Sequence, residues 1–366
     1  MSRTAWGCAA LLALLAALAP LRASAATTCT AVTTALDFGT LSTSAATDSN
    51  AQITVTCQTG ALSILGTIYV RMCLNIGEGA QGGGLGIAPR RMLNPLNDTL
   101  GFQMYRDSAR SLIWGSALNA STPLQVDLTY SSLLTGGSGS ATYTIYGRIP
   151  LQSGIATGLY QNNFSGAFTN LQYRYSEPLI GTPPSMPASC TTGGTGGATA
   201  AQFPFVSSVT AAPVCTIASI ADLDFGSQSG LVDTALNYTT ALSMDCRRRT
   251  AWQVGLDNGQ NASGNIRRMR NAAGQYLTYE LYRDAARSQR WGSTLNSDTQ
   301  TGTGTGNTQS LTLYGRVPAG QTPPPGQLQR RGQGDGYLLR AKRGRGRGKV
   351  ASPDAVICRV LLGMPP

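Results

Sequence analysis

The chain carries one fifteen-residue motif twice. It reads Tyr-Arg-Asp-Ser-Ala-Arg-Ser-Leu-Ile-Trp-Gly-Ser-Ala-Leu-Asn over 105–119 and Tyr-Arg-Asp-Ala-Ala-Arg-Ser-Gln-Arg-Trp-Gly-Ser-Thr-Leu-Asn over 282–296. A duplication this clear predicts two domains of the same fold, which suits a chain of 366 residues. Each repeat can therefore be compared with the other, position by position.

Other shared blocks follow the same order in both repeats. Leu-Asp-Phe-Gly stands at 36–39 and 223–226, Arg-Arg-Met at 90–92 and 267–269, and an alternating run that stops at proline over 143–150 and 311–318. Alternation of polar and apolar residues is typical of half-buried strands. The chain is also rich in glycine and carries only 12% charged residues. Short strands joined by many turns, and hence an all-β fold, are expected.

The repeated motif itself predicts a hairpin. Aspartate opens a turn over Asp107–Arg110 and again over Asp284–Arg287, and Trp114 and Trp291 end the return strands. An Asp/Arg pair beside an aromatic residue is also found in sugar-binding sites. A turn with a charge pair and a buried tryptophan is the favoured interpretation.

The cysteines are paired between the repeats. Cys29 and Cys57 have the same order and similar spacing as Cys215 and Cys246, which predicts one structural disulfide per repeat. A redox or metal pair is the alternative, but no histidine accompanies them. With those four, Cys8 of the N-terminal leader and Cys358 set aside, the pair left is Cys73 and Cys190, a second bridge of the first repeat.

The chain contains no histidine. This removes the usual general base, the Ser/His and Cys/His nucleophile arrangements and the commonest metal ligand. Scattered carboxylates are the remaining candidates for acid–base chemistry. We therefore expect a protein that is not an enzyme, with no catalytic residue, no metal site and no cofactor.

Residues 1–25 have the features of a secretory signal peptide. Arg3 precedes a short apolar run, and Ala23-Ser24-Ala25 resembles a cleavage site. The run is too short to span a membrane, and no later segment is apolar enough for a transmembrane segment. We expect export through the periplasm, where disulfides are permitted.

The positive charge is concentrated at the C-terminal end. The net charge is +11, and residues 327–366 hold nine basic and two acidic residues. The rest is about neutral once the leader is removed, so nucleic-acid binding by the body is not expected. Codons for 327–339 shifted by one base can read Ser-Tyr-Ser-Asp-Ala-Val-Lys-Val-Thr-Val-Thr-Tyr and stop. We interpret the tail as a frameshift near Gly326, real or a sequencing error. A disordered RG-rich arm that binds RNA or anionic surfaces is the alternative.

The shared blocks together resemble the spore coat protein U domain family. The match occurs twice and is specific in the second copy. There it runs from the first cysteine through Leu-Asp-Phe-Gly, Arg-Arg-Met and Tyr-Arg-Asp-Ala-Ala-Arg to Tyr-Gly-Arg-Val-Pro-Ala-Gly-Gln-Thr-Pro-Pro-Pro-Gly. The first copy departs from the pattern between Cys73 and Arg90 and at Cys190. The resemblance extends to subunits of archaic chaperone–usher pili, which are immunoglobulin-like β-sandwiches that lack their final strand.

This resemblance implies two tandem immunoglobulin-like sandwiches after the signal peptide. Residues 26–212 would be a first domain closed by its own strand within 200–212, and 213–326 a second, incomplete domain that needs a donor strand. The implied partners are a periplasmic chaperone, an outer-membrane usher and an adjacent pilin subunit. Few residues precede Cys29 after cleavage, so a strand-donating extension is not expected. A tip adhesin at the cell surface, acting in attachment and biofilm formation, is therefore the hypothesis.

Adhesion would rest on exposed apolar residues in loops of the first domain. The candidates are Leu85, Ile87, Leu133, Leu134, Leu159 and Tyr160. Such residues can form a hydrophobic surface for abiotic or lipid-like material. They can equally be buried anchors of their loops. A spore- or cell-coat protein without a pilus is the alternative function.

Overall fold

The computed structural model describes residues 27–61, 65–117, 121–178, 183–201, 203–227, 231–322 and 355–360. The expected signal peptide and most of the basic tail lie outside these residues. The regular elements of the described parts are strands, apart from short 3-10 turns, and this confirms the predicted all-β class. The chain divides into two compact units, one of residues up to Leu93, Leu100–Leu151 and Gln161–Val209, the other of Asn94–Thr99, Gln152–Tyr160 and Thr210 onward.

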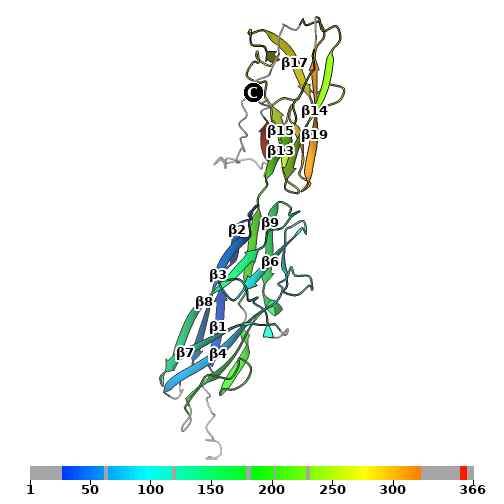
Figure 1. Cartoon of the computed structure of the whole chain (residues 1–366). Coiled ribbons are helices and arrows are strands. Elements are labelled where there is room, and N and C mark those ends of the chain that lie inside the picture. Colours follow the sequence, from blue (N-terminus) through cyan, green and yellow to red (C-terminus); the bar gives the residue numbers. More distant parts are fainter. Residues whose placement is uncertain are drawn as a thin grey trace, which may run out of the picture. The chain divides into compact units, whose positions relative to one another are not determined.

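The first repeat forms two sheets, coloured blue to green in Figure 1. One has eight strands in the order β1-β3-β8-β6-β5-β9-β12-β2, and the other has four in the order β11-β10-β4-β7. The bounds are β1 Thr27–Thr33, β2 Leu36–Thr40, β3 Thr47–Thr59, β4 Gly66–Ile76, β5 Arg90–Leu93, β6 Thr99–Tyr105, β7 Leu124–Ser132, β8 Gly137–Ile149, β9 Gly158–Phe164, β10 Thr169–Ser176, β11 Gly196–Ala201 and β12 Phe205–Ala211, with a 3-10 turn η2 at Gly166–Phe168.

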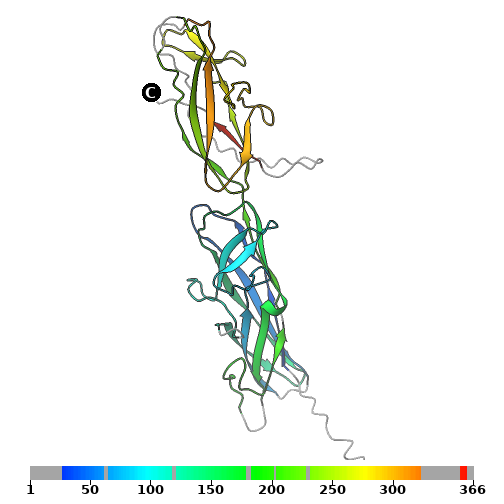
Figure 2. The same ribbon diagram turned by 90° about the vertical axis from the view of Figure 1, so that its right-hand side faces the viewer.

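The second repeat forms two smaller sheets. One has five strands in the order β13-β14-β19-β17-β16, and the other has three in the order β18-β15-β20. Figure 2 shows β20 as the short red strand. The bounds are β13 Cys215–Ile220, β14 Leu236–Cys246, β15 Ala251–Leu256, β16 Arg267–Arg270, β17 Tyr276–Tyr282, β18 Gln300–Thr303, β19 Thr308–Val317 and β20 Ala355–Val360.

The long ladder of β3 and β8 shows how alternating polar and apolar residues form one sheet of the sandwich. The strands pair antiparallel from Thr47 with Ile149 to Thr59 with Gly137. Ala51, Ile53, Val55 and Cys57 point inward and are buried. The outward hydroxyls pair across the strands, so that Thr54 Oγ1 lies 2.8 Å from Thr142 Oγ1. The inward side chains provide one wall of the core.

Three disulfides join the cysteine pairs that the sequence indicated. They are Cys29–Cys57, Cys73–Cys190 and Cys215–Cys246. Cys29 lies directly opposite Cys57 in the β1–β3 ladder, and Cys215 opposite Cys246 in the β13–β14 ladder. The two equivalent bridges therefore lock the same strand pair in each repeat.

Candidate functional site

The repeated motif folds as the predicted turn in both repeats. The carboxylate of Asp107 accepts the backbone N–H groups of Ser111 and Leu112, and the carboxylate of Asp284 accepts those of Ser288 and Gln289. These hydrogen bonds lower the pKa of both aspartates. The aspartate thus organises its own turn, as an N-terminal turn residue does.

The predicted charge pair inside this turn is wrong. Arg110 lies 3.5 Å from Asp48, a residue of β3, and not against Asp107. Its Nε also donates to the carbonyl of Gly147 at 3.1 Å. Arg110 ends the turn with a positive φ of 57°, and its Nη1 also donates to the carbonyl of Ser108 within the turn at 3.3 Å. A sugar site built on an Asp/Arg pair has no basis here.

Trp114 and Trp291 are fully enclosed, and each anchors the opposite sheet. The indole of Trp114 donates to the carbonyl of Leu74 at 2.7 Å, and that of Trp291 to the carbonyl of Val254 at 2.8 Å. Both side chains are buried. The tryptophans are therefore structural cross-links between the two sheets of each repeat.

A buried arginine completes this anchor, a role that the sequence analysis did not foresee. Arg90 donates to the carbonyl of Trp114 at 2.7 Å, and Arg267 to the carbonyl of Trp291 at the same distance. Burial lowers the pKa of the Arg90 guanidinium to about 9, so it stays charged at neutral pH. Its side-chain acceptor is the neutral Gln103, whereas Arg267 is paired with the carboxylate of Glu280.

The two repeats differ most at the Leu-Asp-Phe-Gly block. In the first repeat it forms β2, whose neighbour in the sheet is β12. In the second repeat residues 223–226 are not a strand, although Leu223 and Phe225 still face the core and are buried. No described strand of the second repeat corresponds to β12 or β9 in the sheet order. Among the described residues, no strand pairs with the backbone of 223–226, which therefore borders an unpaired edge of this part of the sandwich.

A close approach explains why this block is held in place without a partner strand. Leu36 and Phe38 pack on Gly147, and Leu223 and Phe225 pack on Gly315. A Cβ atom at Gly315 would lie 2.5 Å from Leu223 Cδ2, and one at Gly147 would lie 2.6 Å from Phe38 Cζ. The glycine of the Tyr-Gly-Arg block is required by this contact.

In the first repeat, β12 closes the edge that is open in the second. Phe205 stacks on Phe164 of β9 with ring centroids 4.7 Å apart, and Thr157 Oγ1 donates to the carbonyl of Ala211 at 2.9 Å. β12 therefore runs antiparallel to β9. On its other side, Ser208 Oγ donates to Asp37 of β2 at 3.1 Å. The strand starts immediately after Pro204, a position where the missing N–H costs no ladder bond.

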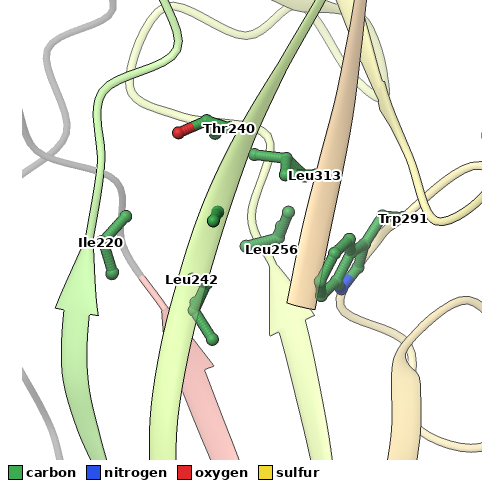
Figure 3. Close-up of a pocket in the computed structure, with 7 residues that line it drawn as sticks. Ile220, Thr240, Leu242, Leu256, Trp291 and Leu313 are labelled. Atoms are coloured by element: carbon green, nitrogen blue, oxygen red, sulfur yellow. The ribbon is translucent and has the colours of Figure 1, made fainter. Parts of the chain in front are cut away.

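The second repeat instead has a pocket between its sheets, shown in Figure 3. It is small, with a cavity volume of about 10 Å³, which is room for roughly one water molecule. Leu242 and Leu313 come from the five-stranded sheet, and Leu256 and Trp291 from the opposite side. The full lining is Ile220, Thr240, Ala241, Leu242, Leu256, Trp291 and Leu313. Apart from Thr240, the residues that line the pocket are apolar.

The candidate adhesive residues of the first domain do not gather in one place. Ile87 is half-buried, and its carbonyl accepts from Gln103, which pairs with Arg148 of β8. Leu133 and Leu134 form the turn before Gly137, the other end of β8. The two ends are eleven residues apart, roughly 36 Å in an extended strand. The loop of Leu85 and Ile87 is therefore separate from the turn of Leu133 and Leu134.

The sequence analysis expected Leu159 and Tyr160 in a loop. This expectation was wrong, because both residues lie in strand β9. Tyr160 is 0% exposed, and its hydroxyl donates to the carbonyl of Ala156 at 3.0 Å. Leu159 is exposed because neighbouring residues of a strand point to opposite faces. Tyr160 is therefore an anchor of the core and cannot contact an external surface.

The sequence analysis did not include Leu65 among its exposed apolar candidates. Leu65 is 63% exposed and adjoins Gly66, which pairs with Ser132 in the β4–β7 ladder. It therefore lies next to Leu133 and Leu134, which are 56% and 70% exposed. These three residues, the leucine pole, make one apolar patch at the end of the first repeat. The pairing of two strands far apart in sequence creates this patch, so no local signal could have indicated it.

No group of three or more His, Cys, Asp or Glu side chains is placed to hold a metal ion within the described parts of the chain. Across those same ranges, none of the helical segments has the length and hydropathy to cross a bilayer.

Comparisons with known proteins give a family and several distant relatives. Residues 15–165 and 201–329 match the model of the Spore Coat Protein U domain. Protein U of Myxococcus xanthus is 35% identical over 127 residues, which are 31% of this chain and 70% of that protein.

Among solved structures, the CsuC–CsuE chaperone–tip adhesion subunit pre-assembly complex from archaic chaperone–usher Csu pili of Acinetobacter baumannii covers 81% of this chain and 97% of the matched chain, with TM-score 0.42 and 16% identity. The CupB6 tip adhesin from Pseudomonas aeruginosa covers 80% and 90%, with TM-score 0.28 and 10% identity. Because the two segments that match the family model span more than half of the chain, the protein belongs to the Spore Coat Protein U domain family.

Proposed function

We propose that this protein is a non-enzymatic subunit of a chaperone–usher pilus, positioned at the tip and acting in surface attachment and biofilm formation. It is exported through the periplasm to the cell surface. Its second repeat, residues 213–326, accepts a strand first from a periplasmic chaperone and then from an adjacent pilin at the outer-membrane usher. Its first repeat, residues 26–212, needs no donor.

One observation carries this proposal: the same Leu-Asp-Phe-Gly block is a paired strand in the first repeat, whereas in the second repeat it has no strand partner among the described residues. An unpaired edge beside an apolar pocket is what β-augmentation requires, because the incoming strand supplies both backbone hydrogen bonds and side chains. The first repeat fills the same place with β12 from its own chain.

The adhesive part of the proposal rests on the leucine pole. Leu65, Leu133 and Leu134 expose contiguous apolar surface in two adjoining loops. Exposed apolar patches mark sites of contact with other apolar material. Leu85 and Leu159 are exposed as well, but they lie elsewhere and are proposed only as separate, weaker contacts.

The strand-accepting role is tested by co-expressing the full chain with a chaperone of this pilus class. A stable one-to-one complex by size exclusion is expected. Replacing both Leu223 and Phe225 with serine should abolish it, since these residues line the edge that the donor joins. The matched control replaces Leu36 and Phe38, which are already covered by β12. Recovery of the chain as a chaperone-free monomer with unchanged solubility would contradict the proposal.

The adhesive role has its own test. Serine at Leu65, Leu133 and Leu134 together should reduce attachment of cells to polystyrene at least about tenfold if the patch provides the contact. Serine at the exposed Leu85 and Leu159 serves as the control. Equal attachment by the triple variant and the parent would remove the leucine pole from the proposal.

A coat protein without a pilus is the second candidate. The observation that favours it is the family itself, which is described as a spore coat domain. Immunogold electron microscopy of intact cells separates the two. Label at the ends of thin fibres supports the pilus, and an even layer over the envelope supports the coat.

A further inference from the structure

At one end of the first repeat, a chain of buried hydroxyl groups leads to a single carboxylate. Thr27 Oγ1 donates to Glu177 Oε1 at 3.0 Å and lies 2.7 Å from Thr59 Oγ1. Thr59 Oγ1 lies 2.7 Å from the hydroxyl of Tyr130. Each hydroxyl has a single hydrogen to donate. Because Thr27 uses its hydrogen for Glu177, Thr59 donates to Thr27, and Tyr130 donates to Thr59. The whole chain therefore directs its hydrogens toward the carboxylate.

These groups come from strands that only the sandwich brings together. Thr27 begins β1 and pairs with Thr59 at the end of β3, whereas Tyr130 lies in β7 and Glu177 directly follows β10. The three hydroxyl residues are buried, and Glu177 is half-buried. Donors that all point the same way in such a place suit an ionised carboxylate, because hydrogen bonds to the charged form favour that form.

Glu177 has no cation beside it among the residues that the structure describes. None of the ion pairs formed within those ranges includes it. Arg174, on the same strand end, donates to a loop carbonyl at 2.7 Å. The titratable groups that interact with the carboxylate are the phenols of Tyr130 and Tyr175. Burial raises the pKa of Glu177, and the threonine hydrogen bond lowers it. A neighbouring positive charge would stabilise the ionised form further.

Removal of the leader creates a positive charge next to this carboxylate. Cleavage after Ala25 makes Ala26 the first residue, and Ala26 directly precedes Thr27. A free α-amino group has an ordinary pKa of about 7.7–8.0, so it is mostly charged at neutral pH. Neighbouring Cα atoms are about 3.8 Å apart, which keeps this group close to the threonine that contacts Glu177. The hydroxyl of Tyr173 donates to the carbonyl of Thr27 at 3.3 Å and fixes that residue on its other side.

We propose that Glu177 is the binding site of the mature N-terminus, and that the α-ammonium group of Ala26 pairs with its carboxylate once the leader has been cleaved after Ala25. The pair cannot form in the precursor, because the nitrogen of Ala26 there belongs to a neutral peptide bond. This inference rests on the export through the periplasm that is part of the proposed function. It gives the first repeat a stabilising contact that only processing supplies.

The pair lies at the end of the first repeat that carries the leucine pole. Pro178 follows Glu177 and packs against Gly66, where an added Cβ atom would lie 2.6 Å from Pro178 Cγ. Gly66 is the neighbour of Leu65. Fixing Glu177 to the N-terminus therefore also holds the segment that supports one loop of the leucine pole. Processing of the leader is in this way linked to the surface proposed for adhesion.

The test measures the pKa of the α-amino group in the exported protein. The full precursor is expressed with its leader, and mass spectrometry of the N-terminal peptide is expected to show Ala26 as the first residue. The rate of carbamylation of this amine by cyanate is then followed against pH. In the folded protein its pKa should lie at least about one unit above the ordinary value, because the carboxylate favours the charged amine. Glu177→Gln should return the pKa to the ordinary value. Asp233→Asn, which removes an exposed carboxylate of the second repeat, is the matched control and should keep it raised.

Stability gives a second measurement of the same pair. A raised pKa of the amine means that its contribution is present below the unfolded pKa of about 8 and is lost as pH rises through the folded pKa. The first calorimetric transition of the parent should therefore fall between about pH 8 and pH 10, and that of Glu177→Gln should fall less. A glycine inserted between Ala26 and Thr27 moves the amine away without changing the carboxylate, and should have the same effect as Glu177→Gln.

The outcomes separate this inference from the proposed function. An exported protein that begins at another residue, or that begins at Ala26 with an α-amino group of ordinary pKa, would overturn the pairing alone. A raised pKa that persists in both Glu177→Gln and the glycine insertion would also overturn it. If Glu177→Gln is not recovered as folded protein, the glycine insertion decides, since it leaves residues 27–366 unchanged. A chain that stays in the cytoplasm with its leader attached would overturn the export on which the inference rests.

Discussion

The two repeats have the same motifs but different numbers of strands, and the difference identifies what each lacks. Beside the strands that the two share, the first repeat has β2, β9, β10, β11 and β12. The second has β20 where β10 would lie on β4, but in parallel orientation. Strand formation at Leu-Asp-Phe-Gly follows the presence of β12 and not the sequence of the block. A segment therefore forms a β-strand only when another strand pairs with its backbone, whereas its packing against the core depends on its own apolar side chains.

The buried arginines teach the same lesson about partners. Arg90 is satisfied by the carbonyls of Gly77 and Trp114 together with Gln103. Arg267 has equivalent carbonyls, but its side-chain partner is Glu280, which also pairs with Arg290 at 2.9 Å. The first repeat stabilises the buried guanidinium of Arg90 with carbonyl and amide dipoles. At the same position of the fold, the second repeat pairs Arg267 with a carboxylate.

The largest effect should come from adding strands to the second repeat. Replacing residues 327–366 with Ser-Tyr-Ser-Asp-Ala-Val-Lys-Val-Thr-Val-Thr-Tyr should raise the melting temperature of the second unit by on the order of 10 °C, because core face and edge become covered. Differential scanning calorimetry measures this. A shuffled segment of the same composition is the control. An unchanged second transition would contradict the frameshift interpretation of the tail.

Phe203 packs on Trp114 and anchors the closing segment of the first repeat, so removing its ring should leave that segment less firmly held. Phe203→Ala should lower the free energy of unfolding of the first unit by ~3–5 kcal/mol, since a fully buried ring on Trp114 is lost. Urea unfolding followed by tryptophan fluorescence reports it. Thr210→Ala, on the exposed face of β12, is the control and should change stability by less than about 0.5 kcal/mol. Similar values for the two variants would show that Phe203 is not an anchor.

The bridge found only in the first repeat should stabilise only that unit. Cys73 and Cys190 are 117 residues apart, and loop entropy gives a disulfide of this kind ~2–5 kcal/mol. Serine at both positions should shift the first calorimetric transition and leave the second in place. Serine at Cys215 and Cys246 should do the reverse. A shift of both transitions in either variant would mean that the units do not unfold independently.

Exchanging the side-chain partners of the buried arginines, Gln103 and Glu280, should show in which repeat the stability depends on a charged partner. Glu280→Gln recreates the arrangement of the first repeat and should destabilise the second unit by ~1–3 kcal/mol, because Arg267 and Arg290 then share no carboxylate there. Gln103→Glu is the matched change in the first unit and should be neutral or stabilising. Chemical denaturation of both variants measures the difference. If both changes destabilised their units equally, the fit of the side chain and not its charge would determine which residue pairs with the buried arginine.

The smallest effect concerns the turn that both repeats share. Hydrogen bonds lower the pKa of Asp107 and Asp284 below the ordinary value of 3.8. Their contribution is therefore present above the unfolded pKa and is lost as pH falls through the folded pKa. Asp107→Asn and Asp284→Asn should each flatten the fall of melting temperature below about pH 4. Equal flattening is expected in the two units, and an effect in one alone would break their equivalence.

Some features could be predicted from the sequence because they depend on neighbours along the chain. The turns at Asp107 and Asp284, the strand start after Pro204 and the alternating burial of β3 are of this kind. The cysteine pairing also followed from spacing between the repeats. Hydrogen bonds within a turn and alternation along a strand need no knowledge of distant residues.

Other features depend on residues that only the folded chain brings together. Arg110 meets Asp48 and not Asp107, Tyr160 is buried in β9, and Leu65 joins Leu133 through the β4–β7 ladder. The same Leu-Asp-Phe-Gly sequence is a strand in one repeat and not in the other. The sequence by itself determined the duplication, the all-β class and the disulfide framework. The tertiary structure alone decided which edge is closed, since a strand edge is satisfied by backbone groups from far along the chain, or from another chain.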